Sequence, residues 1–227
     1  MKTAYVPVEN LPLIQELHDN FETIEQEIFS LYERFGKHPK FRKTILGVGR
    51  NEPNKGKQSY YGTVKNIGLL LDDVVLDPQE RVLAYGKDDA NREQKQAMIK
   101  SRRETTKWIN QWILRNIDNL CHVSLFIMHP GSAITPHYGV SDAMVRVHLG
   151  ILCPPEVKFY TDFDEPRQWR RNETFGFLDY EVNHWVKFDQ TDNQTPRIVF
   201  CADVVRPYYE KYYPGVVAAL KVELGLN

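Results

Sequence analysis

The sequence predicts a mainly β protein, a barrel or jelly roll, with helices ahead of it along the chain. Beyond Leu120, short runs rich in β-branched and aromatic residues alternate with segments that contain Gly, Pro, Asn and Asp, a pattern typical of strands joined by turns. These runs are CHVSLFIMH, MVRVHLGIL, VKFYTDF, TFGFLDY, NHWVKF and RIVFCADVV. With 227 residues, of which 42% are hydrophobic and 12% aromatic, the chain is long enough to bury a sizeable core.

Helices are expected before this β region. Between Ile14 and Phe35 the apolar residues recur at alternating spacings of three and four, which aligns them on one face of a helix. A second amphipathic pattern lies within residues 90–120 and includes Ile109 and Trp112. The segment between the two patterns contains GVGRNEPNKG, which matches neither phosphate-binding glycine motif, so we expect a loop there.

We expect residues 1–227 to form a single domain, because no linker separates the helical and β patterns. Within it, a helix-rich part (1–120) precedes a β-rich jelly-roll core (121–207) and a C-terminal tail (208–227). The tail opens with YYEKYYPG, which predicts an aromatic patch that closes the end of the barrel or contacts a partner. The oligomeric state stays open.

Charge and cysteine content indicate which partners and which cellular compartment to expect. The chain has 29 basic and 30 acidic residues, and this balance does not favour a nucleic-acid partner. Its cysteines, Cys121, Cys153 and Cys201, are odd in number and form no CxxC pair, which fits a reducing compartment. The first residues lack the apolar stretch of a signal peptide, and no apolar run approaches the ~20 residues of a membrane span. We therefore expect a cytoplasmic protein without a membrane anchor.

Two of the predicted strands carry cationic residues on one face. In MVRVHLGIL the strand period of two places Arg146 and His148 together, opposite an aliphatic face. In RIVFCADVV it places Arg197 and Asp203 together, again opposite an apolar face. The polar faces either meet solvent or line an interior pocket for an anionic ligand, since the guanidinium fork matches carboxylate geometry.

Histidines gather in the β region, where five of the seven occur. They are His122, His129, His137, His148 and His184. Histidine is the commonest metal ligand, although a single histidine is more often structural. His137 lies in PHYG at a turn before a strand, and His184 begins a later strand. Strand ends that meet at the mouth of a barrel can bring two such ligands together, but the spacing alone does not show that they meet.

The stretch MHPGSAITPHYGVSDAMVRVHLGILCP (128–154) resembles the aspartyl/asparaginyl β-hydroxylase family, which uses Fe(II) and 2-oxoglutarate. The family pieces M-H-P-G, P-H-x-G and R-x-H-L-G-[LI] all occur here in order. Two later segments, FGFLDYEVNHWVKF and PRIVFCADVVRP, resemble the distal histidine segment and the final strand of the family. The resemblance covers residues 121–207.

The resemblance implies a double-stranded β-helix core, of the jelly-roll or cupin-like kind, together with Fe(II), 2-oxoglutarate as cosubstrate, and O2. It implies His137 and His184 as the iron ligands, and Arg197 as the partner of the distal 2-oxoglutarate carboxylate. His148 would lie near the other end of the cosubstrate. Arg146, the third expected catalytic residue, would hold the proximal carboxylate or an acidic substrate.

The chain departs from the wider pattern at three positions. Gly139 stands where most 2-oxoglutarate oxygenases have the carboxylate of an HxD motif; the family tolerates glycine there, but the gap also leaves room for a halide, as in related halogenases. Phe126 stands where the family has a serine that assists the cosubstrate, and we expect Ser124 to substitute for it. His184 follows Asp179 at a spacing one residue longer than in the family, and is assigned as the last histidine of the chain.

The expected activity is hydroxylation of an unactivated carbon, the β-carbon of an aspartyl, asparaginyl or related amino-acid substrate. That substrate would be free, carrier-tethered or part of a peptide, and would bear a carboxylate or amide. One alternative is an oxygenase of another outcome, a halogenase or a lipid or acyl hydroxylase, for which dependence on chloride is one discriminating observation. The other is a non-catalytic jelly roll that binds a carboxylate, which metal stoichiometry would distinguish. His129 is expected to be structural.

Overall fold

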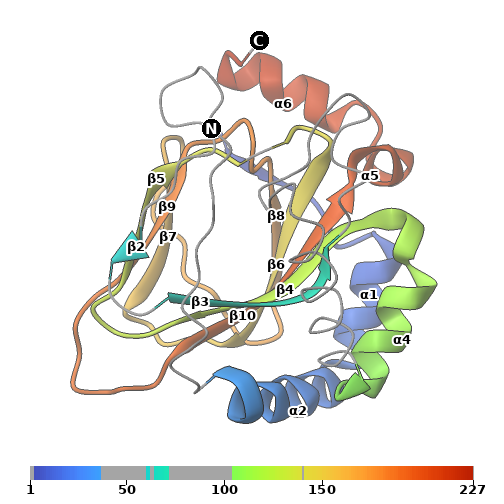
Figure 1. Ribbon diagram of the computed structural model, residues 1–227. Coiled ribbons are helices and arrows are strands. Elements are labelled where there is room, and N and C mark those ends of the chain that lie inside the picture. The colour runs from blue at the N-terminus through green and yellow to red at the C-terminus, as the bar shows by residue number, and fades with distance from the viewer. Residues whose placement is uncertain (1–2, 37–59, 62–63, 72–103, 140, 227) are drawn as a thin grey trace, which may run out of the picture.

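Two antiparallel sheets stand opposite each other and form the body of the protein (Figure 1). The computed structural model describes residues 3–36, 60–61, 64–71, 104–139 and 141–226. Across the larger sheet the strands are β1 (Tyr5–Val6), β8 (Thr174–Phe177), β6 (Met144–Leu152), β10 (Arg197–Val205), β4 (Leu120–Met128) and β3 (Val64–Leu71). Across the smaller sheet they are β2 (Tyr60–Tyr61), β5 (Ala133–His137), β9 (His184–Phe188) and β7 (Val157–Thr161).

This arrangement is a double-stranded β-helix, so the predicted fold class is confirmed. Each of the β-rich runs noted in the sequence contains one strand of the two sheets. The strands β1, β2, β3 and β5 were not predicted from the sequence. Because β1 pairs with β8 and β3 pairs with β4, residue 120 is not a structural boundary, and segments from both sides of it build one sheet.

The N-terminal apolar face is confirmed, but it belongs to two helices rather than one. The chain forms α1 (Pro12–Asp19) and α2 (Phe21–Leu31), followed by a π-helical turn, η1 (Tyr32–Gly36). They separate at Asn20, whose φ of −116° and ψ of 21° lie outside the helical range. The Asn20 side chain donates to the Glu16 carbonyl at 2.9 Å, so it replaces a backbone hydrogen bond at the end of α1.

A third helix, α4 (Lys107–Arg115), is the described part of the second predicted helix, and a 3₁₀ turn, η2 (Ile117–Asn119), links it to β4. The Glu27 carboxylate of α2 accepts hydrogen bonds from the backbone N–H groups of Trp108 and Ile109, at 2.8 and 3.0 Å. This contact satisfies donors at the start of α4 that have no partner within the helix. The GVGRNEPNKG segment and residues 90–103 lie outside the described residues.

The helices cover one face of the larger sheet (Figure 1). Their buried residues form one core cluster with the apolar faces of β6 and β10. The sheet residues of that cluster include Val145, Val147, Leu149, Ile198, Phe200 and Ala202. Because side chains alternate along a strand, the intervening residues of β6 and β10 point to the opposite face, toward the smaller sheet. The polar faces seen in the sequence therefore lie inside the β-helix.

The C-terminal residues are helical and form α5 (Arg206–Tyr212) and α6 (Val216–Leu224). Tyr208, Tyr209 and Tyr213 are buried in the core cluster that contains the N-terminal helices. The backbone N–H of Asn10 donates to the Tyr213 hydroxyl at 2.7 Å, which ties the two ends of the described chain together. In the part of the chain that the structure describes, no helix combines the length and apolar character needed to cross a membrane.

Candidate active site

A pocket lies between the two sheets, with a cavity volume of about 40 Å³. Its lining includes the histidines and arginines that the family resemblance assigned to iron and cosubstrate: His137, Arg146, His148, His184 and Arg197. The rest of the lining is apolar: Phe126, Ile134, Phe159, Phe177 and Val186. Residues far apart in the sequence thus meet in one pocket, which contains two arginines and three histidines.

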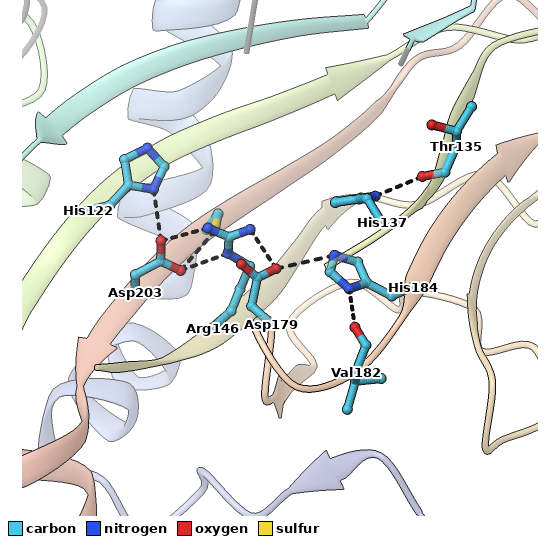
Figure 2. Close-up of polar contacts among 9 residues, drawn as sticks. His122, Thr135, His137, Arg146, Asp179, Val182, His184 and Asp203 are labelled. Carbon is cyan, nitrogen blue, oxygen red and sulfur yellow. Dashed lines mark hydrogen bonds and ion pairs between the residues drawn. The ribbon is translucent and has the colours of Figure 1, made fainter. Parts of the chain in front are cut away.

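His137 and His184 lie side by side, at the facing ends of β5 and β9. They are paired across the two strands, and their ring centroids are 4.2 Å apart. The Nδ1 atoms lie 2.7 Å from the Thr135 carbonyl oxygen and 2.8 Å from the Val182 carbonyl oxygen, respectively (Figure 2). A carbonyl only accepts, so Nδ1 carries a proton in both rings, and Nε2 is the nitrogen that points away from the carbonyl.

Both rings are therefore oriented as metal ligands commonly are, with Nδ1 fixed by a backbone carbonyl. Burial, followed by the neighbouring His184, lowers the pKa of His137 to about 3. A neutral imidazole is the form that binds a metal ion. The pair thus fits the two-histidine part of an iron site.

Asp179 follows β8 and lies fully buried beside these histidines. Its Oδ1 is 3.2 Å from His184 Nε2 and accepts a hydrogen bond from Arg146 Nη1 at 2.8 Å (Figure 2). Its Oδ2 is buried and has no hydrogen-bond partner among the described residues. The backbone N–H of Gly139 donates to the Asp179 carbonyl at 2.6 Å, and a Cβ at position 139 would overlap Asp179 Oδ2.

Arg146 is held between two aspartates. Asp203 lies opposite it in the β6–β10 pairing and accepts from Nε at 2.7 Å and from Nη2 at 2.8 Å. Burial alone would lower the pKa of Arg146, but Asp179 and Asp203 raise it well above its ordinary value. We expected this guanidinium to hold a carboxylate of the cosubstrate or substrate; the structure instead gives it two internal carboxylates.

Behind Arg146, the polar chain continues to His122, whose Nδ1 is 3.2 Å from Asp203 Oδ2 (Figure 2). Ligand atoms of His122, Cys201 and Asp203 lie within 4.8 Å of one another, and no other group of three potential ligands in the described residues is so compact. The atoms of His137, His184 and Asp179 are therefore more widely spread. A cation between His122 and Asp203 would face the Arg146 guanidinium, which already binds both Asp203 oxygens, so this group does not fit a metal.

Arg197 differs from Arg146 in its surroundings. It is 1% exposed, and no side-chain hydrogen bond or ion pair joins it to another described residue. Its guanidinium carbon lies 4.5 Å from the centre of the Trp169 ring. Burial lowers its pKa to about 10, so it is still a cation at neutral pH. A buried cation without a carboxylate is unfavourable unless a ligand supplies one.

His148 lies in the same part of the pocket and has aromatic neighbours. Both ring nitrogens are buried without a hydrogen-bond partner in the described part of the chain. Rings of Phe126, Phe159, Trp169, Phe175 and Phe177 surround it. Burial, together with the charges of Arg146 and Arg197, lowers the pKa of His148 well below its ordinary value. The neutral ring offers one donor and one acceptor to a ligand.

Ser124 and His129, which were also considered in the sequence, do not line the pocket. Ser124 is buried on the same side of β4 as Phe126, but only Phe126 is part of the pocket wall. His129 follows β4 and does not line the pocket. The sequence analysis did not assign a role to Asp179 or Asp203. The alternation of β10 placed Asp203 on the same face as Arg197, and this was the available signal; nothing in the spacing linked Asp179 to Arg146.

The sequence profile of the family described as "Aspartyl/Asparaginyl beta-hydroxylase" matches residues 56–207, which is 152 of the 227 residues. The chain belongs to the aspartyl/asparaginyl β-hydroxylase family. "Aspartyl/asparaginyl beta-hydroxylase" of Mus musculus is 33% identical over 82 residues, 36% of this chain and 10% of that protein. "Aspartate beta-hydroxylase domain-containing protein 2" of Xenopus tropicalis is 28% identical over 93 residues, 41% of this chain and 23% of that protein.

The match thus spans between a tenth and a quarter of the length of these curated relatives. Among solved structures, a prolyl-4-hydroxylase of Pseudomonas putida aligns with 86% of this chain and 100% of its own, at 13% identity and a TM-score of 0.42. A cupin-like protein of Thermotoga maritima aligns with 72% of this chain and 96% of its own, at 10% identity and a TM-score of 0.35.

Proposed function

We propose that this protein is an Fe(II)- and 2-oxoglutarate-dependent dioxygenase that hydroxylates an unactivated carbon. The proposed target is the β-carbon of an aspartyl, asparaginyl or related amino-acid substrate. One observation carries the proposal: a single pocket holds two imidazoles whose Nδ1 atoms are fixed by backbone carbonyls and, apart from them, the buried guanidinium of Arg197, which has no ion-pair partner among the described residues. The imidazoles suit Fe(II), and the guanidinium suits a carboxylate.

In this proposal His137 and His184 hold the iron through Nε2. Bound iron with 2-oxoglutarate and O2 supplies the oxidising power that an unactivated C–H bond requires. The hydrogen bonds from Nδ1 to the Thr135 and Val182 carbonyls fix the plane of each ring and its tautomer. The two ligands are therefore set in place by the backbone of their own segments before any metal binds.

Arg197 binds the distal carboxylate of 2-oxoglutarate. The Trp169 ring, 4.5 Å from its guanidinium carbon, orients the fork that faces the ligand. His148 lies beside it and donates or accepts one further hydrogen bond as a neutral ring. A carboxylate that enters here removes the cost of burying Arg197 alone, so binding gains strength from the state of the empty protein.

Apolar side chains close the rest of the pocket. Phe159 and Phe177 lie between the histidines and His148, with ring centroids 5.6 and 5.0 Å from that of His184. Such a wall excludes bulk water, which strengthens the charge interactions inside and protects reactive species from side reactions. The wall and the cations together define a site for a small dianion next to a metal.

The substrate class comes from the family and not from the pocket. Arg146 already binds two aspartates, so we propose that a substrate carboxylate or amide is recognised outside this guanidinium. Free, carrier-tethered and peptide substrates all remain within the proposal. It also includes a cytoplasmic setting, which the odd number of cysteines without a CxxC pair supports.

The test is anaerobic. Fe(II) and then 2-oxoglutarate are added to the apo-protein, and the visible charge-transfer absorption of a chelated keto acid is recorded. We expect it in the wild type and in His129→Ala, the control histidine outside the pocket, and we expect its loss in His184→Ala. Absence in the wild type, or equal loss in both variants, contradicts the proposal. Screening for hydroxylated products then starts with aspartyl and asparaginyl compounds.

A further inference from the structure

We propose that Phe126 determines which 2-oxo acid the pocket accepts, and that it makes the site selective for the five-carbon 2-oxoglutarate over its six-carbon homologue, 2-oxoadipate. This inference rests on the proposed function, because it requires one ligand to reach from the metal held by His137 and His184 to the guanidinium of Arg197. It adds a specificity-determining residue to that site, a wall side chain without charge or hydrogen-bonding groups.

The two ends of the proposed cosubstrate are held at fixed positions. Arg197 is buried at the start of β10, a strand that pairs with a neighbour on both sides, and the two histidines lie at the paired ends of β5 and β9. Met128 lies opposite Arg197 in the β4–β10 pairing. Both Met128 and the Trp169 ring beside the guanidinium belong to a buried apolar cluster. Because these side chains close off the region behind Arg197, a longer ligand bound at both ends must press against the side walls.

Between these ends, one level of the larger sheet has a rigid side and a side formed by a single large side chain. At this level Val199 of β10 lies opposite Gly150 of β6 and opposite Phe126 of β4. On the β6 side, a Cβ added to Gly150 would overlap the Arg170 carbonyl oxygen and crowd the Cys153 Sγ, so other atoms already fill that space. On the β4 side the phenyl ring occupies the space. Phe126 is therefore the large side chain that limits the width of the pocket at this level.

The burial of Phe126 indicates that its ring serves the pocket and not the core. It lines the pocket together with His148 and Arg197, and its ring centroid lies 6.3 Å from that of His148. Its neighbours in β4, Leu125 and Ile127, are fully buried. Phe126 is half-buried and belongs to neither of the two core clusters in the described part of the chain. A ring with uncovered apolar surface gains favourable contact when the methylene stem of a ligand packs against it.

The cavity leaves little room to spare. Its volume of about 40 Å³ corresponds to about three water molecules, at ~10–15 Å³ each. A six-carbon acid bound at both ends would have to place its additional methylene group against the ring of Phe126. One methylene group more than a hydrophobic pocket accommodates changes affinity by about 10–200-fold. We therefore expect 2-oxoadipate to bind more weakly than 2-oxoglutarate by a factor in this range.

The experiment compares two ligands on one protein. Without oxygen and with Fe(II) present, wild type, Phe126→Ala and Phe188→Ala are titrated calorimetrically with 2-oxoglutarate and with 2-oxoadipate. The readout is the ratio of the two dissociation constants, which does not change when part of a preparation is unfolded. Phe188→Ala is the matched control, because Phe188 is buried in the same apolar cluster as Met128 and Trp169 but does not line the pocket.

We expect wild type to favour 2-oxoglutarate by about 10–200-fold, and Phe126→Ala to lower this ratio at least about fivefold, mainly because 2-oxoadipate binds more tightly. We expect Phe188→Ala to keep the wild-type ratio. No preference in wild type, an unchanged ratio in Phe126→Ala, or an equal change in Phe188→Ala would overturn the inference. Should Phe126→Ala not fold, Phe126→Leu tests the same point; we expect a ratio below that of wild type, and an unchanged ratio overturns the inference.

Failure of the proposed function gives a different result. In that case neither keto acid binds the wild type in a way that depends on Fe(II) and on His184. If instead wild type binds 2-oxoglutarate with Fe(II), His184→Ala does not, and the ratio is the same in wild type and Phe126→Ala, the oxygenase site stands while the role of Phe126 is refuted.

Discussion

Arg146 and Arg197 enter the same pocket from neighbouring strands, β6 and β10, but their surroundings differ. Opposite Arg146, across the strand pairing, lies Asp203, and a second carboxylate approaches from the β8–β9 connection. Opposite Arg197, across the pairing with β4, lies Met128. One arginine is therefore neutralised by the protein, and the other is buried with apolar and aromatic neighbours.

The difference shows how position in a sheet decides the role of identical side chains. A guanidinium that binds two internal carboxylates stabilises the fold, because its removal leaves both carboxylates buried without a cation. A guanidinium without an internal partner destabilises the empty protein and gains its partner from a ligand. The family resemblance alone gave both arginines to ligands; only their neighbours distinguish them.

The strongest test of this comparison is Arg146→Met. We expect the free energy of unfolding at pH 7 to fall by about 3–5 kcal/mol, because two buried carboxylates lose their cation while the volume is roughly kept. Urea unfolding measures the loss. Arg171→Met is the control, because Arg171 forms ion pairs with Glu22 and Glu25 at the surface, where solvent screens them, so its loss should destabilise the protein far less. Equal losses of unfolding free energy in the two variants would mean that the buried ion pairs of Arg146 stabilise the fold no more than the surface ion pairs of Arg171.

Arg197→Met should give the opposite pattern. We expect the free energy of unfolding to stay level or rise, because an unpaired buried charge is replaced by an apolar side chain. We expect 2-oxoglutarate binding to weaken by about 2–5 kcal/mol, since one partner of a buried charge pair is removed. Calorimetric titration with 2-oxoglutarate in the presence of Fe(II) measures this. Unchanged affinity would mean that Arg197 does not bind the cosubstrate carboxylate. The two arginines would then not differ in ligand binding.

The sequence was sufficient to predict which residues share a face of a strand, but not which face lies inside. The strand period of two separated Arg146 and His148 from the apolar face that packs on the helices, and it did the same for Arg197. It also placed His137 and His184 at strand ends, where two ligands can meet, without showing that they do. Each of these placements depends only on alternation within a strand or on a strand end.

Contacts between strands were beyond that reasoning. Whether Asp203 meets Arg146 depends on β6 and β10 being neighbours in register, which neither segment encodes by itself. The position of Asp179 depends on the turn after β8 and on the absence of a side chain at Gly139. The break between α1 and α2 depends on the local hydrogen bond of Asn20. The roles of the pocket residues toward iron and cosubstrate stay predictions.

A smaller expected effect is the pH dependence of the stability that the ion pair between Arg146 and Asp203 provides. Burial would raise the pKa of Asp203, but the Arg146 guanidinium, its hydrogen bonds and His122 bring it well below the ordinary value of 3.8. The folded protein therefore releases this proton more readily than the unfolded chain does. The stabilisation is complete above the unfolded pKa and is lost as the pH falls through it toward the folded pKa.

Asp203→Asn removes this contribution, so we expect the difference in unfolding free energy between wild type and variant to shrink below about pH 4, by up to about 1.4 kcal/mol per pH unit. The groups that face Asp203 are Arg146, His122 and the Cys201 thiol. Arg146 does not titrate in this range, and the thiol stays protonated, because burial raises the pKa of Cys201 well above its ordinary value. Urea unfolding between pH 6 and pH 2.5, roughly two units above and one below the unfolded pKa, measures the difference. If this difference in unfolding free energy does not change with pH, the charge of Asp203 does not stabilise the folded protein. The ion pair between Asp203 and Arg146 would then contribute nothing to stability.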